Sequence, residues 1–127
     1  MKMSENEVAK IVVDLCYHIH RRYGPGLLES VYETILFHGL KKAGLAAERQ
    51  KWIHIWHDDL FVKNAFRADI IVEGIVLIEL KSVDDLPRCY HKIVITYLTL
   101  AHMKLALLVN FRVGLFKEGV HRIVNNL

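Results

Sequence analysis

The 127-residue chain has few cysteines, only two prolines and no long uninterrupted apolar run. Its two cysteines, Cys16 and Cys89, are too few for a disulfide scaffold or a four-thiolate zinc site, so both are expected to be buried thiols. The longest apolar stretch, residues 93–109, is interrupted by His102 and Lys104 and is shorter than the ~18 residues that indicate a membrane span. The first residues also lack a basic segment followed by an apolar one. We therefore expect a cytoplasmic protein without a membrane contact.

A strong charge of one sign is missing as well. Seventeen Lys and Arg residues stand against 14 Asp and Glu residues, which leaves a net charge of +3 that allows a polyanionic partner without requiring one. The hydrophobic share of 53% and the charged share of 24% exclude a disordered chain. The length fits one domain over residues 1–127, and so much apolar sequence in a short chain favours a homo-oligomer such as a homodimer.

The first third of the chain predicts two helices. Ser4 and Glu7 have capping-box spacing ahead of apolar residues at helical intervals, which predicts a helix over residues 4–22. The Gly-Pro-Gly segment at 24–26 ends it. Apolar residues recur again over residues 28–42, where basic residues and a glycine follow as they do at helix C-termini. A helical hairpin is expected.

Strand patterns follow. Alternation over residues 47–57 and an Asp-Asp turn predict strands there and at 60–62. Residues 66–72 and 75–81 are apolar on both faces, which predicts a hairpin in a sheet that is covered on each side.

The rest of the chain alternates helix and strand. We expect a helix over residues 87–101, a buried strand over 105–111, and a final short hairpin within 114–124 that turns at Glu118 and Gly119. The order of elements predicts an α/β fold with a mixed central sheet flanked by helices.

Three charged residues stand inside strands that are otherwise apolar: Asp69, Glu79 and Lys81. Burying an unpaired charge costs several kcal/mol, so these groups need one another, a cation, or solvent at a cleft. Side chains alternate along a strand, so Glu79 and Lys81 share one face.

The turn between the two strands decides whether Asp69 joins that face. A two-residue loop at 73–74 would place Asp69 opposite Ile78, on the other face of the sheet. A three-residue loop such as 72–74, with its glycine in the left-handed region, would bring Asp69 to the face of Glu79. We therefore predict a bulged or three-residue turn.

Two carboxylates beside a lysine suit a hard divalent cation. Oxygen atoms of Asp69 and Glu79, with the Leu80 carbonyl, would hold Mg²⁺ or Mn²⁺ together with several waters. Lys81 would orient a water or offset charge that develops on a phosphate. The alternative is structural: a Glu-Lys ion pair at a sheet edge, with Asp69 accepting hydrogen bonds in a turn.

Two motifs carry a family resemblance. Asp69 followed by Glu79, Leu80 and Lys81 resembles the PD-(D/E)XK nuclease-like superfamily, and Gly-Leu-Leu-Glu-Ser-Val-Tyr at residues 26–32 is similar to the motif of its GxxExxY family. The resemblance spans residues 11–124. It implies a restriction-endonuclease-like α/β/α core and Mg²⁺-dependent hydrolysis of nucleic-acid phosphodiesters. We expect a nucleic-acid partner, DNA rather than RNA.

The resemblance also implies roles for single residues. Asp69 and Glu79 would be metal ligands, Glu29 a further acidic group at the metal, and Lys81 the catalytic lysine. Tyr32 lies one helical turn from Glu29, so we expect it to brace that carboxylate or to contact substrate.

One position departs from the pattern. Many relatives carry a glutamine four residues before the Tyr-Leu pair that stands here at 97–98, whereas this chain has Ile93. Isoleucine cannot orient Lys81 or the attacking water. A catalytically reduced protein that binds nucleic acid or another protein is therefore an alternative function.

The remaining patterns are weaker. Cys16 and His20 share a helix face at a spacing that can bind zinc, but a structural role is expected because no third ligand cluster is evident. Trp52 and Trp56 are expected in a core or interface. Arg67 is expected to contact substrate, since it and other basic residues can follow a phosphate backbone. Solvated helix ends explain most of these basic residues equally well (Arg21, Arg22, Lys41, Lys42, Arg49, Lys51, Lys63).

Overall fold

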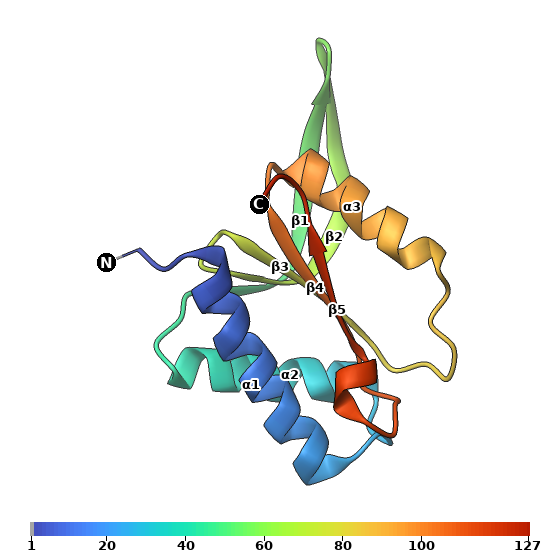
Figure 1. Ribbon diagram of the computed structural model, residues 1–127. Helices are drawn as coiled ribbons and strands as arrows, with labels where there is room; N and C mark the ends of the chain where they lie inside the picture. Colours follow the sequence, from blue (N-terminus) through green and yellow to red (C-terminus); the bar gives the residue numbers. More distant parts are fainter. Residues whose placement is uncertain (1) are drawn as a thin grey trace.

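The computed structural model describes residues 2–127 and contains one mixed five-stranded sheet between helices (Figure 1). The sheet has the strand order β1-β2-β3-β4-β5, and all neighbours are antiparallel except β3 and β4. The elements are α1 (Glu5–Tyr23), α2 (Glu29–Lys42), β1 (Ala47–His57), β2 (Leu60–Val72), β3 (Val76–Lys81), α3 (Cys89–Ala101), β4 (Leu105–Asn110), the short 3-10 helix η1 (Phe116–Glu118) and β5 (Val120–Val124).

The expected start of the first helix is confirmed. The Ser4 hydroxyl accepts a hydrogen bond from the Glu7 backbone N–H at 3.2 Å, and the Glu7 carboxylate accepts one from the Ser4 N–H at 3.1 Å. This capping box satisfies two amide groups that a helix start leaves unpaired. Gly24, at φ 72°, ends α1.

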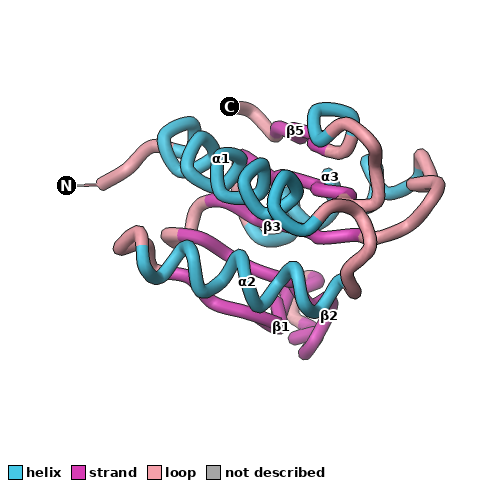
Figure 2. The backbone as a smooth tube through the Cα atoms, turned by 90° about the horizontal axis from the view of Figure 1, so that it is seen from below, coloured by secondary structure: helices cyan, strands magenta, loops and turns pink. Residues whose placement is uncertain are grey.

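Helices cover both faces of the sheet, which confirms the expected α/β/α layering. The α1 and α2 helices pack on one face over a core that includes Ile70, Ile78 and Leu107 (Figure 2). The α3 helix packs on the other face against Leu77 and Leu108. Burial from both sides explains why β3 and β4 are apolar along nearly their whole length.

The turn between β2 and β3 has three residues, as predicted. Val72 pairs with Val76 and Ile70 with Ile78, so three residues, 73–75, form the loop. The loop lies one residue later than the suggested 72–74, because both Glu73 and Gly74 take positive φ angles of 53° and 68°. This register, continued by one residue, brings Asp69 opposite Glu79.

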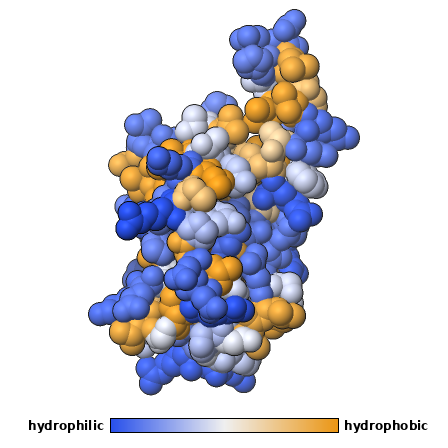
Figure 3. All heavy atoms as spheres, turned by 90° about the vertical axis from the view of Figure 1, so that its right-hand side faces the viewer, coloured by the Kyte–Doolittle hydropathy of each residue, from blue (hydrophilic) through white to orange (hydrophobic). Residues whose placement is uncertain are grey.

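A long arm formed by β1 and β2 projects beyond the body of the protein (Figures 1 and 3). The expected break between strands at 60–62 and 66–72 is wrong, since β2 runs through both. Trp52 and Trp56 are 45% and 69% exposed on this arm, so they are not core residues.

The C-terminal hairpin within 114–124 is also wrong. Residues 116–118 form η1, and β5 pairs with β4, because the Asn110 N–H donates to the Gly119 carbonyl at 2.8 Å and the two strands continue from there. Cys89 is exposed at the start of α3, contrary to the expectation of a buried thiol. Within residues 2–127, no helix has the length and apolar character needed to cross a membrane.

Candidate functional site

The charged residues of β2 and β3 lie where these strands separate. The ladder between the strands runs from the turn to the Ile70–Ile78 pair. Beyond it, the Leu80 N–H donates to Oδ2 of Asp69 at 2.8 Å, so a carboxylate takes the place of a backbone acceptor. The N–H and C=O of one residue in a strand point to the same side. The Leu80 carbonyl therefore faces the same gap as Asp69.

The faces of β2 change at this point. Ala68 packs in the core under α3, whereas Ile70 packs in the core under α1 and α2. Residues two apart in a regular strand share a face, so the backbone is irregular at Asp69. Opposite it on β1, Gln50 has a positive φ of 47°. Because of this irregularity, the Asp69 carboxylate lies between the core under α3 and the core under α1 and α2.

Glu79 is the residue of the site whose charged form is least favoured by its surroundings. Its side chain is 7% exposed, and its Oε1 has no hydrogen-bond partner among the described residues 2–127. Burial, and next the neighbouring Asp69 carboxylate, raise the pKa of Glu79 to about 8, while the Lys81 ammonium lowers it less. Near neutral pH, Glu79 therefore retains a proton unless a cation replaces it.

Lys81 ends β3 and is held by its neighbours. Its Nζ lies 4.4 Å from the centroid of the Tyr90 ring on α3, a cation–π contact. Its strand partner on β4 is Asn110, whose buried amide accepts from the Val83 N–H at 3.1 Å and donates to the Val83 carbonyl at 2.9 Å. The loop after Lys81 is thus fixed, at the carboxyl end of the parallel strand pair where α/β sheets place ligands.

Glu29 begins α2 and is open to solvent. Partial burial raises the pKa of its carboxyl; Lys81 acts in the opposite direction, and Asp69 adds to the rise. These effects place Glu29 within electrostatic range of both residues. Still, no group of three His, Cys, Asp or Glu side chains in the described part of the chain is arranged to hold a metal. Asp69 and Glu79 are the carboxylates that lie side by side.

The other two expected site residues are placed differently. Tyr32 is fully buried, stacked on Phe111 with ring centroids 4.1 Å apart, and its hydroxyl donates to the Gly24 carbonyl and accepts from the Leu27 N–H. The expected substrate contact of Tyr32 is therefore corrected, because its atoms fasten the loop before α2. Arg67 is exposed on the arm, with its guanidinium 5.3 Å from the centroid of the Trp52 ring.

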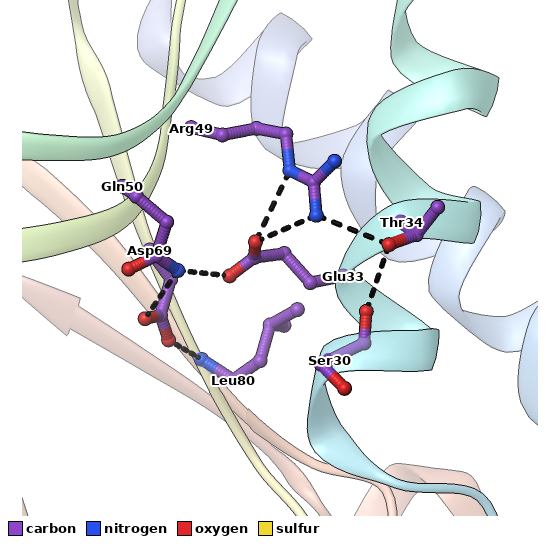
Figure 4. A network of polar contacts seen from close by, with 7 residues as sticks. All are labelled: Ser30, Glu33, Thr34, Arg49, Gln50, Asp69 and Leu80. Carbon is purple, nitrogen blue, oxygen red and sulfur yellow. Dashed lines mark hydrogen bonds and ion pairs between the residues drawn. The ribbon is translucent and has the colours of Figure 1, made fainter.

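Sequence reasoning missed a network that reaches Asp69 from α2 (Figure 4). Glu33 is buried, and its Oε2 accepts from Nε and Nη2 of Arg49 at 3.1 and 3.0 Å. Its Oε1 accepts from the Gln50 amide at 2.5 Å, and the same amide nitrogen lies 3.5 Å from Oδ1 of Asp69. A signal for Glu33 existed, because it shares a helical stripe with the buried residues Leu36 and Leu40.

The position of the expected glutamine lies on the site side of α3. Tyr90 contacts Lys81, and the pKa of Tyr97 is raised by burial and then by Glu79. Ile93 is half-buried one helical turn from each tyrosine. Its side chain offers no hydrogen bond to the site.

The zinc interpretation of α1 finds no support in the geometry. Cys16 is fully buried, and burial raises the pKa of its thiol to about 12. A His20 ring nitrogen makes a 2.8 Å hydrogen bond with the Val113 carbonyl. Both side chains serve packing, as expected.

The fold is that of a nuclease-like α/β/α protein. The chain matches the family model of the PD-(D/E)XK nuclease superfamily over residues 6–123, so it belongs to that superfamily. Neither the curated proteins nor the solved structures contain a match to it.

The donor set fits a divalent metal of this superfamily. Asp69 and Glu79 are adjacent hard oxygen donors, and the Leu80 carbonyl faces the same gap. Glu79 Oε1 is buried and has no hydrogen-bond partner within residues 2–127. Mg²⁺ commonly uses one or two carboxylates and keeps several waters, so it needs no cage of three carboxylates.

Proposed function

We propose that the protein is a Mg²⁺-dependent or Mn²⁺-dependent nuclease that hydrolyses phosphodiester bonds, with DNA preferred over RNA. The observation that carries this proposal is the buried Oε1 of Glu79, next to Asp69 and Lys81, which has no partner in the described part of the chain. We further propose that the chain is a single cytoplasmic domain of the GxxExxY family over residues 1–127, and that it forms a homodimer.

In this proposal, Asp69, Glu79 and the Leu80 carbonyl would hold the metal, and Glu29 at the start of α2 would be a further acidic group facing it. The metal supplies positive charge that polarises the phosphate and acidifies water. Replacing the proton on Glu79 by a cation removes the repulsion between the two carboxylates.

Lys81 is the residue that handles charge at the phosphate. Its ammonium can donate to the developing oxyanion or to the attacking water, and the Tyr90 ring limits the positions of the side chain. Arg67 lies exposed on the arm two residues before Asp69, so it would contact the backbone of a bound strand near the site.

The test is cleavage of single-stranded and double-stranded DNA and RNA with Mg²⁺, with Mn²⁺ and with EDTA. Wild-type protein should cut in metal and not in EDTA, and Asp69→Asn and Lys81→Met should each lose cutting by a factor of about 100 or more. The matched controls are Asp14→Asn and Lys10→Met, since these residues form an exposed ion pair on α1. Cutting that survives in both site variants would rule out the proposal.

A second function is supported by Ile93, which cannot orient a water or Lys81. If the protein binds nucleic acid without cutting it, the fold serves as a binding module. Binding should then weaken as salt rises and should be reduced in Arg67→Ala. Substitution Ile93→Gln separates the two functions. The variant should gain cutting if the protein is a weakened nuclease with an intact metal site, and it should not cut if the fold serves only as a binding module.

A further inference from the structure

Gln50 occupies a backbone position that suits glycine better. It has a φ of 47° within β1, directly opposite Asp69, where the Arg49–Ile70 and Lys51–Ala68 pairs enclose an unpaired step. A left-handed conformation is sterically unfavourable for a non-glycine residue. Such strain persists only where the surroundings hold it in place.

The surroundings that hold Gln50 come from α2. Its amide nitrogen donates to Oε1 of Glu33, whose other oxygen is held by Arg49 through two hydrogen bonds (Figure 4). Glu33 is 6% exposed, so this anchor is well shielded from water. The amide position is therefore determined by a hydrogen bond to a buried carboxylate, although Gln50 itself is exposed on β1.

The anchored amide is aimed at Asp69. Its nitrogen lies 3.5 Å from Oδ1, while Oδ2 of the same carboxylate is held by the Leu80 N–H at 2.8 Å. The two contacts act on different oxygens, so together they limit rotation of the carboxylate. Each carboxylate oxygen has two lone pairs, so Oδ1 retains one for a cation.

We propose that Gln50 is a positioning residue that orients the Asp69 carboxylate for metal binding. This inference rests on the proposed metal-dependent function. Gln50 acts from β1, on the side of the site opposite α3 and Ile93. Hydrogen-bond partners behind a metal ligand contribute to affinity, and their loss typically weakens binding about 10- to 100-fold.

The test measures Mn²⁺ binding to the apoprotein by calorimetry, without any nuclease assay. Gln50→Gly removes the amide and relieves the positive φ, whereas Gln50→Met removes the amide and keeps the strain. Both variants should bind Mn²⁺ about 10- to 100-fold more weakly than wild type while remaining folded by circular dichroism. The matched control is Asn64→Gly, because Asn64 is an exposed residue of β2 with a φ of 58° away from Asp69.

The outcomes separate this inference from the function on which it rests. If wild type binds Mn²⁺ and both Gln50 variants bind it equally well, Gln50 has only a structural role and the inference is wrong. If Met weakens binding and Gly does not, the backbone strain and not the amide is responsible, which also overturns it. If wild type binds neither Mn²⁺ nor Mg²⁺, the proposed function fails as well.

Discussion

The carboxyl groups of Asp69 and Glu79 lie next to each other where β2 and β3 separate, and one of them is buried. Ionising both carboxyl groups at this distance costs free energy through their repulsion, unless a cation lies between them. The apoprotein meets this constraint by keeping a proton on Glu79. In the proposed nuclease, a proton and the metal would therefore compete for the same place beside Asp69.

The first prediction concerns pH. The folded-state pKa of Glu79 is about 8, against 4.5 for an ordinary glutamate, so the folded protein keeps a proton that the unfolded chain releases. The free energy of unfolding of the apoprotein should then fall as pH rises from about 4.5 to about 8. Denaturant titrations in EDTA across this range should show the fall in wild type and lose most of it in Glu79→Gln. Exposed Glu118→Gln is the control; an unchanged pH profile in Glu79→Gln would contradict the prediction.

The second prediction concerns metal-linked stability. A metal that binds only the folded protein should raise the free energy of unfolding by about 2.7 kcal/mol at 100 times its dissociation constant. Thermal melting with added Mn²⁺ should show a midpoint several degrees higher than in EDTA. Asp69→Asn should abolish the increase while its amide oxygen still accepts from the Leu80 N–H. Asp14→Asn should behave as wild type; an equal increase in Asp69→Asn would place the metal elsewhere.

The third prediction concerns Tyr32. Tyr32→Phe keeps the stack on Phe111 but removes the hydroxyl that bonds the Gly24 carbonyl and the Leu27 N–H. Losing these bonds should cost about 1 to 3 kcal/mol of stability, measured by urea unfolding. Nucleic-acid affinity of the folded variant should stay within about twofold. Unchanged stability with weakened binding would restore the role of Tyr32 as a substrate contact.

The fourth prediction concerns the two thiols. Cys89 is exposed, whereas Cys16 is fully buried and has a thiol pKa raised to about 12. A thiol-specific chromogenic reagent should label one cysteine rapidly in the native protein and both after unfolding. Cys89→Ser should remove the rapid reaction. Rapid labelling that survives in this variant would show that Cys16 is accessible.

Local patterns in the sequence were sufficient for several elements. The capping box of Ser4 and Glu7 depends on residues three apart, so it could be predicted without any tertiary contact. The three-residue length of the β2–β3 turn could be predicted, because only an odd number of loop residues brings Asp69 to the face of Glu79. The position of the loop could not, because it depends on which residues adopt positive φ angles.

The missed residues of the site depend on distant contacts. Gln50 reaches Glu33 and Asp69 across 17 and 19 positions of the chain, and nothing in its neighbourhood marks it. Tyr32 was misjudged for a related reason. Its place in the motif beside Glu29 is visible in the sequence, but the packing of its ring on Phe111 is decided by the approach of α2 to the end of β4.

The sequence by itself determined the layered α/β fold, the strands buried on both faces, and the presence of Asp69, Glu79 and Lys81 in them, because apolar periodicity and burial costs act along the chain. Only the tertiary structure decided how those charges are compensated. The separation of β2 from β3, the lack of a partner for Glu79 Oε1 among the described residues, and the anchoring of Gln50 by Glu33 arise where elements distant in sequence meet. Hydrogen bonds at such places depend on three-dimensional geometry, which local patterns do not contain.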